Sequence, residues 1–209
     1  MSYKKEIRIF WQVGVSRRQV DLVVSAVKLF LKHTEAEDKI TVKIGEAIDL
    51  RFFKELNYFF WRGFLNGNRI MDYLSYGHQN CNPDFHAILL ARSRFFMAVD
   101  GKKKMVNGLA EKGRAALVFI DQPGRLKNPY ARKRITLTVI HELGHVFGLI
   151  SEKRKEDVLL SFGRYRHCGR NCAMYPDTGI IDYLDLEKRI FCPECRLELK
   201  NFFSTGNEP

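Results

Sequence analysis

Residues 141–149 read HELGHVFGL, and this stretch constrains the chain more than any other. His141 and His145 are four residues apart, so on a helix they lie one turn apart on the same face and can bind one metal ion. Glu142 lies between them, where its carboxylate could reach a water bound to that metal. Two helical histidines leave coordination positions open, which is typical of a catalytic zinc rather than a structural one. The motif therefore predicts metal-assisted hydrolysis.

A helix whose histidines are half-buried and bind nothing could show the same spacing. However, the residues before His141, from Ile135 to Ile140, are mostly apolar and β-branched. They predict a helix that enters the core, where two histidines and a carboxylate would be costly without a metal. Gly148 follows His145 by three residues, where it can take a positive φ and turn the chain off the helix. Both features favour zinc.

Four of the five cysteines form two short pairs near the end of the chain. Cys168 and Cys172 are spaced C-x3-C, and Cys192 and Cys195 are spaced C-x2-C. Such pairs let two loops each present two thiolates to a tetrahedral zinc. The alternative is a redox CxxC pair, but no thioredoxin-like βαβ pattern precedes it. We therefore expect a second, structural zinc, and interpret Cys81 as an ordinary thiol.

His167 directly precedes Cys168. In an extended segment neighbouring side chains point to opposite sides, so His167 could complete the catalytic site while Cys168 serves the structural one. Carboxylates are rivals for the third ligand, because they serve this role in other zinc peptidases. The rivals are Glu152, Glu156 and Asp157. Their alternation with Lys153, Arg154 and Lys155 favours a solvated charged face, so His167 is the preferred ligand.

These residues together resemble the archaemetzincin family of zinc metallopeptidases, strongly over about residues 100–195. The resemblance implies that His141, His145 and His167 bind a catalytic zinc and that Glu142 is the general base. It also implies that the four paired cysteines hold a structural zinc, giving two zinc ions per chain, and that Met174 forms the turn beneath the catalytic site. The substrate would be a peptide or protein. The matching residues are His141, Glu142, His145, Gly148, His167, Cys168, Cys172, Met174, Cys192 and Cys195.

The chain departs from the family pattern in two places. The family's third histidine comes three residues after the glycine, whereas here Ser151 stands there and sixteen residues, 151–166, precede His167. An insertion that returns near its starting point costs little loop-closure entropy, so we expect a hairpin or short helix beside the cleft. The second departure is C-x3-C in place of the family's C-x4-C.

The remaining sequence predicts an α/β fold, a twisted sheet backed by helices, with an active-site helix and a small zinc-stapled C-terminal subdomain. The resemblance implies that the sheet is mixed and metzincin-like. We expect one domain over 1–209, divided into 1–149 with the active-site helix and 150–209 with the structural zinc. The apolar content after Gly148 is read as thin, so the zinc would supply much of that subdomain's folding energy. The expected strands are 6–13, 40–48, 86–91, 105–110 and 115–120, with helices at 16–33 and from Asn128-Pro129 onward.

Other residues receive weaker interpretations. The aromatic stretch 52–74 is expected to form core or cleft wall. The resemblance also implies that substrate pairs with an edge strand by β-addition, and this strand should lie in 95–110 or follow it. Tyr175 could donate to the oxyanion, although a packing role is the simpler interpretation. His33, His78 and His86 have no ligand spacing and are interpreted as surface or loop residues.

The net charge of +11 is concentrated before the active-site helix, since residues 101–134 contain ten Lys or Arg against two acidic residues, a net of +8. Such a field can steer an acidic substrate or nucleic acid, although a solvated basic surface is the simpler interpretation. The absence of a long apolar run predicts no membrane partner, and reduced cysteines favour the cytoplasm. We expect a monomer.

Two other functions remain open. One is a basic, DNA-associated zinc peptidase of the Spartan type, although the Gly148 turn and the His167-Cys168 pair speak against it. The other is a non-catalytic zinc module that binds nucleic acid through its basic segment.

Overall fold

The structure of this protein is a computed structural model. It describes most of the chain, in eight stretches. These are residues 6–50, 60–61, 64–74, 85–99, 101–120, 126–161, 165–176 and 184–205. Cys81, His78 and residues 52–59 and 62–63 of the aromatic stretch lie outside them.

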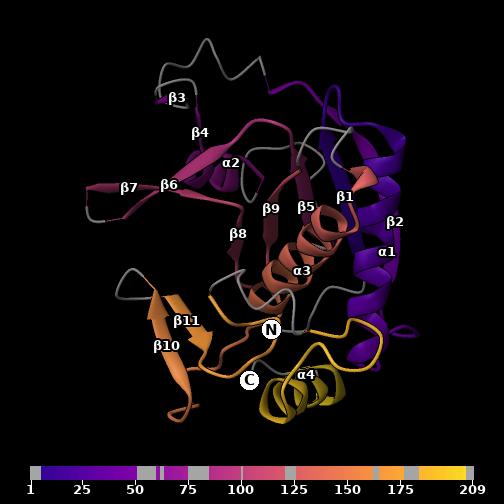
Figure 1. The fold of residues 1–209 in the computed structure, drawn as a ribbon, viewed down its shortest axis with the longest axis vertical. Coiled ribbons are helices and arrows are strands. Elements are labelled where there is room, and N and C mark those ends of the chain that lie inside the picture. Colours follow the sequence, from indigo (N-terminus) through magenta and orange to yellow (C-terminus); the bar gives the residue numbers. More distant parts are fainter. Residues whose placement is uncertain are drawn as a thin grey trace.

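The centre of the molecule is a mixed five-stranded sheet (Figure 1). Four neighbouring strands are parallel, and the last strand, at one edge, is antiparallel. The central strand β5 has all seven residues buried, as expected for a strand covered on both faces. In spatial order the strands are β2 (Thr41–Ile48), β1 (Glu6–Gln12), β5 (Phe85–Ala91), β9 (Ala115–Phe119) and β8 (Gly108–Glu111).

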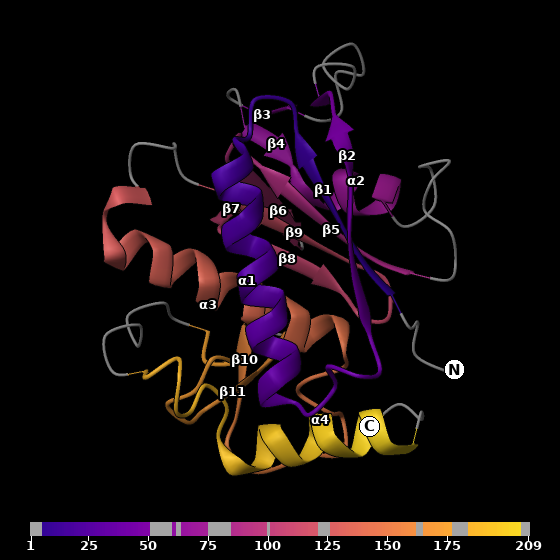
Figure 2. The same ribbon diagram turned by 90° about the vertical axis from the view of Figure 1, so that its right-hand side faces the viewer.

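Two long helices, α1 (Arg17–His33) and α3 (Pro129–Val146), cover one face of this sheet (Figure 2). Helix α1 begins after Ser16, whose backbone N–H donates to the Gln19 side-chain oxygen at 2.8 Å. Helix α3 begins after Asn128, whose side-chain oxygen accepts from the Tyr130 N–H at 2.9 Å. Both predicted helix starts are confirmed, because they depend on local hydrogen bonds.

A second, four-stranded sheet and a short helix cover the opposite face. The predicted strand 105–110 is wrong, because the chain changes sheets at Asn107. Residues before Asn107 pair with β6 and those after it pair with β9. An alternating pattern shows which residues are extended, but does not show which neighbour they pair with. The elements are β3 (Phe60–Trp61), β4 (Phe64–Asn66), β6 (Phe95–Val99), β7 (Lys102–Val106) and α2 (Gly67–Asp72).

The segment after Gly148 consists of a hairpin, two connecting loops and a final helix. Strands β10 (Val158–Ser161) and β11 (Tyr165–Cys168) pair antiparallel, so of the two alternatives expected for the insertion, a hairpin or a short helix, the structure has the hairpin. Helix α4 (Pro193–Thr205) packs against the main core. The prediction that this segment is poor in apolar residues is wrong, since six large apolar side chains after the hairpin are buried in that core. They are Leu184, Ile190, Phe191, Leu199, Phe202 and Phe203.

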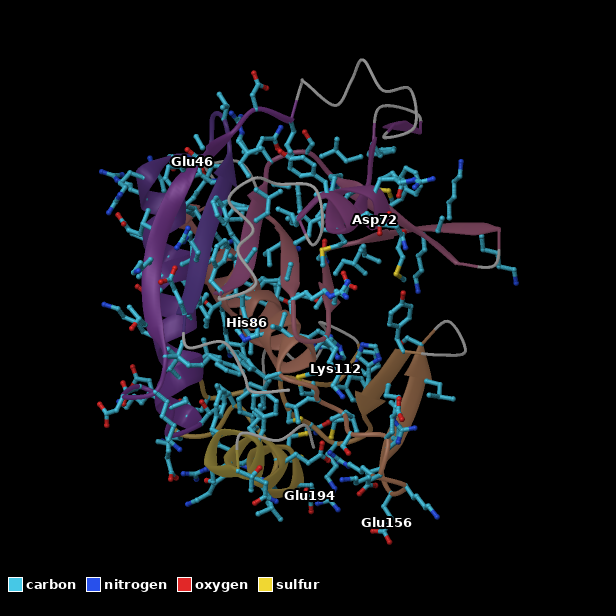
Figure 3. All side chains as sticks on the ribbon, turned by 180° about the vertical axis from the view of Figure 1, so that it is seen from behind. Glu46, Asp72, His86, Lys112, Glu156 and Glu194 are labelled. Atoms are coloured by element: carbon cyan, nitrogen blue, oxygen red, sulfur yellow. The ribbon has the colours of Figure 1, made fainter. Side chains whose placement is uncertain are left out.

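The predicted surface position of His86 is also wrong. Its side chain is 2% exposed on β5, and its ring lies 4.9 Å from that of Phe147 (Figure 3). His33 is half-buried at the end of α1, with Nε2 3.0 Å from the carbonyl of Leu186. Among the described residues no helix combines the length and the apolar composition needed to span a membrane.

Candidate metal centres

Helix α3 carries His141 and His145 on the face that points toward the C-terminal segment. Their Nδ1 atoms lie 2.7 Å from the carbonyl of Ala173 and 2.8 Å from that of Leu149. A carbonyl only accepts hydrogen bonds, so each Nδ1 carries the proton and each Nε2 presents a lone pair. The two Nε2 atoms are 3.1 Å apart. Two lone pairs at that distance repel each other unless a cation lies between them, so the geometry fits a bound metal.

His167 reaches the same place from β11. Its ring centroid lies 5.2 Å from that of His141 and 4.9 Å from that of His145, and the three donor atoms all lie within 4.8 Å of one another. Burial, with His167 nearby, lowers the pKa of His141 to about 4. Burial also lowers the pKa of His145 and of His167. All three imidazoles are therefore neutral at neutral pH, which is the form that binds metal.

The turn after α3 supports this arrangement. Gly148 has a φ of +84°, as its position after the motif predicts. The turn brings the carbonyl of Leu149 to the Nδ1 of His145. A single glycine therefore both ends the helix and orients one of the histidines.

The rival acidic residues do not join this histidine group. Glu156 lies exposed at the foot of the β10–β11 hairpin (Figure 3), and Asp157 pairs with Arg170 at 2.7 Å. Glu152 lines the cleft. Among the described residues, the group that could hold a metal here is His141, His145 and His167.

Glu142 lies on α3 directly beneath the edge strand β8, and its side chain is 6% exposed. A Cβ placed on Gly108 of β8 would lie 2.6 Å from the Cγ of Glu142, and closer still to its carboxylate. Burial raises the pKa of Glu142 to about 8. The carboxyl group therefore lies in a low-polarity pocket whose roof is the backbone of β8, a site that suits a group that exchanges protons near neutral pH.

Met174 is fully buried beneath the histidine group. A Cβ placed on Gly144, between the two helical histidines, would lie 2.9 Å from the Met174 Cε. The Met174 carbonyl accepts from the Cys168 N–H at 2.9 Å. The methionine therefore forms the floor of the site, and its backbone ties the turn to the strand that carries His167.

The four paired cysteines meet directly behind this floor. The sulfurs of Cys168 and Cys192 are 3.7 Å apart, and those of Cys172 and Cys195 are 3.9 Å apart. These distances exclude disulfide bonds, which require about 2.05 Å. All four sulfurs lie within 4.8 Å of one another and are buried. Four converging sulfurs are the donor set that a structural zinc prefers.

A cleft of about 490 Å³ opens onto Glu142 and the histidine group. Strands β7 and β8 form one wall, and the β10–β11 hairpin contributes Ser161, Tyr165 and Arg166 to the other. Two residues of the basic segment, Lys104 and Lys112, also line the cleft. The acidic-substrate and nucleic-acid interpretations of that segment stay predictions. Tyr175 is half-buried and lines the same cleft.

Comparison of the structure with solved structures identifies proteins with a similar fold. The archaemetzincin of Methanopyrus kandleri superposes with a TM-score of 0.59 at 20% identity, covering 96% of each chain. The archaemetzincin of Archaeoglobus fulgidus, solved with malonate, gives a TM-score of 0.57 at 18% identity, covering 91% of this chain and 97% of its own. The chain has an archaemetzincin-like fold. No family model and no curated protein matches its sequence.

The archaemetzincin-like fold confirms the resemblance and the fold class predicted from the motifs. The structure brings all eight site residues predicted from the sequence into two adjoining groups. They are His141, Glu142, His145 and His167 at the cleft, and Cys168, Cys172, Cys192 and Cys195 behind it.

Two residues beside these groups were not predicted from the sequence. Gly108 was detectable in principle, because a glycine within a strand signals close backbone approach. The sequence predicts a solvated charged face that includes Arg154. This prediction is wrong for Arg154, because its side chain is 9% exposed and contacts two of the cysteines. Neighbouring lysines and glutamates gave no signal of its burial.

Proposed function

We propose that this protein is a zinc peptidase. The observation that carries the proposal is the convergence of three neutral imidazoles beside a buried carboxylate, in a cleft whose roof is an open strand edge. Metal-assisted hydrolysis requires an open set of nitrogen ligands, an adjacent base and a place for the substrate backbone. All three lie within one cleft.

His141, His145 and His167 would hold the catalytic zinc, and the four paired cysteines would hold a second, structural zinc. When bound, the catalytic zinc would activate a water and polarise the scissile carbonyl. The Nδ1 contacts of His141 and His145 to backbone carbonyls hold each ring with Nε2 toward the metal position. The ligands are therefore oriented before a metal binds.

Glu142 acts as the general base in this proposal. It accepts a proton from the attacking water and later delivers that proton to the leaving amine. Burial beneath β8 raises the pKa of its carboxyl group to about 8, and the positive charge of a bound zinc would lower that pKa toward the range in which the carboxylate accepts a proton. The same carboxyl group can therefore serve as base and then as acid.

The substrate backbone would pair with β8. Among the described strands, β9 is the one neighbour of β8 in its sheet, so the other edge of β8 is open. The Phe119 N–H donates to the Asn107 carbonyl at 2.8 Å, so Gly108 and Ala110 are the strand residues whose backbone groups face the open edge. An extended peptide added there would run along the cleft above Glu142.

Purified protein tests the proposal directly. We expect close to two zinc ions per chain by elemental analysis. Glu142→Gln should retain both zinc ions and lose peptide hydrolysis by about 100-fold to 10,000-fold, the usual range for a general base. Glu156→Gln is the matched control, since this exposed glutamate lies outside the cleft lining, and it should keep full activity.

Two results would contradict the proposal. A protein with one zinc that survives His141→Ala would leave the histidine group without a metal and favour a non-catalytic zinc module. Hydrolysis that persists in Glu142→Gln would exclude Glu142 as the general base.

A further inference from the structure

Arg154 is a buried cation in the segment that separates Gly148 from His167. Its side chain is 9% exposed, although the chain around it is rich in exposed charged residues. A guanidinium withdrawn from water is costly unless it is paired and hydrogen-bonded. Its partners therefore indicate its role.

The guanidinium of Arg154 bridges the two cysteine pairs. Its Nη1 donates to the sulfur of Cys195 at 3.2 Å, and its Nη2 donates to the sulfur of Cys168 at 3.2 Å. Cys195 belongs to α4 and Cys168 to β11, so the planar fork reaches one sulfur from each half of the site. The two N–H groups of the planar guanidinium make both contacts at once.

The rest of the side chain is held in place by its neighbours. Its Nη1 lies 3.6 Å from the Glu198 carboxylate on α4, and its Nε donates to the Glu156 carbonyl at 3.1 Å. The same Glu198 accepts from the Ser151 N–H at 2.9 Å. Arg166 on β11 donates to the Arg154 carbonyl. Contacts other than those to the sulfurs therefore hold both parts of Arg154. Glu198 on α4 and the Glu156 carbonyl hold its guanidinium, and the hairpin holds its backbone.

A zinc ion bound by four thiolates carries two excess negative charges. Burying that charge is unfavourable unless nearby positive groups offset it. Arg154 supplies such a charge at hydrogen-bond distance from two of the four sulfurs.

We infer that Arg154 is a positioning residue of the cysteine zinc site, which holds one thiolate of each pair at its zinc-binding position. The inference rests on the proposed structural zinc but not on peptidase activity. Cys168 directly follows His167, so a guanidinium that holds the Cys168 thiolate also fixes the backbone next to the third histidine. The segment 151–166 supplies this guanidinium and therefore does more than connect Gly148 to His167.

Metal competition tests this inference on the full chain. Against a chromogenic chelator, Arg154→Met should release the cysteine-bound zinc about 10-fold to 100-fold more readily, the usual cost of losing a partner of a metal ligand. Arg154→Lys keeps the charge but lacks the fork, so it should fall between Arg154→Met and the unsubstituted protein.

The matched control is Arg170→Met. The guanidinium of Arg170 pairs with Asp157 and Glu194 at 2.7 Å and 2.5 Å. Its backbone N–H donates to the sulfur of Cys168 at 3.4 Å, and a methionine keeps this contact. Its substitution removes the same charge near the cluster, so we expect zinc release as in the unsubstituted protein. A similar loss in Arg170→Met would show that only general charge matters and would overturn the inference.

Cobalt substitution separates this inference from the proposed function. Sulfur-to-cobalt charge-transfer bands report the thiolate site alone and can be read in the inactive Glu142→Gln background. We expect Arg154→Met to shift and weaken these bands while circular dichroism shows a folded chain. Unchanged bands and unchanged zinc release in a folded variant would overturn the inference. If Arg154→Met does not fold, Arg154→Lys is the test. Zinc release and cobalt bands identical to those of the unsubstituted protein would exclude a role for the guanidinium fork.

Discussion

At the scale of single residues, the site depends on places where a side chain is absent. Gly108 leaves room for the Glu142 carboxylate against β8, and Gly144 leaves room for Met174 beneath the helical histidines. Any Cβ at either position would contact the site residue below van der Waals distance. The site is therefore shaped by these glycines as much as by its polar groups.

Gly108→Ala should displace the Glu142 carboxylate without removing any proposed ligand. We expect kcat/KM for a peptide to fall on the order of 100-fold, as for a misplacement of about 1 Å, with zinc content unchanged. Gly101→Ala is the control, because a Cβ there meets nothing within 4 Å. Its positive φ of +74° costs about 1–2 kcal/mol of stability but should leave activity intact. Normal activity in Gly108→Ala would show that this contact does not place the carboxylate.

At the scale of elements, the edge strand β8 and the β10–β11 hairpin bound the cleft. The hairpin brings His167 to one metal group and Cys168 to the other, because adjacent residues of a strand point to opposite sides. The edge strand lies over Glu142 with its outer backbone groups free of β9. In the proposed function, β8 would bind the substrate backbone, while the hairpin would add the third histidine to the two on α3.

Ala110→Pro removes one backbone donor from the open edge of β8. Proline is tolerated on an edge strand when its nitrogen faces outward, so the fold should persist. We expect kcat/KM for a peptide to fall about tenfold, corresponding to one lost hydrogen bond of about 1–1.5 kcal/mol. Ala110→Val keeps the N–H and should retain more activity than Ala110→Pro. Equal kinetics for the proline and valine variants would contradict backbone pairing at this position.

At the scale of the whole molecule, Phe147 joins parts of the chain that are distant in sequence. Its ring lies 5.5 Å from that of Phe30 on α1, 4.9 Å from His86 on β5, and 5.0 Å from Phe203 on α4. The sheet, the first helix and the last helix therefore meet at the residue that follows α3. The C-terminal segment shares this core rather than having a core of its own.

Phe147→Ala should destabilise the whole chain. We expect a loss of about 3–5 kcal/mol in the free energy of unfolding, the usual cost of removing a buried phenylalanine. Urea unfolding of the zinc-loaded protein, followed by fluorescence and circular dichroism, should show one transition at a lower midpoint. Leu197→Ala on the exposed face of α4, where Leu197 is 58% exposed, should change stability by at most about 0.5 kcal/mol. Two separate transitions would mean that the C-terminal segment unfolds independently.

Much of the candidate site could be predicted from the sequence because its geometry is local. The spacing of His141 and His145 follows from the helical repeat, the turn at Gly148 from the missing Cβ, and the opposite directions of His167 and Cys168 from the strand repeat. Helix starts at Ser16 and Asn128 depend on hydrogen bonds within three residues. Such features need no knowledge of what the chain packs against.

The features that only the tertiary structure decided all depend on distant partners. His86 is buried because α3 ends with Phe147 against it, and Arg154 is buried because α4 and β11 close over it. The chain leaves one sheet for another at Asn107 because Phe119 pairs there. By itself the sequence determined which residues could bind metal, through short-range repeats. The tertiary structure decided which charged side chains and which backbone segments surround these residues, because burial depends on segments that meet only after folding.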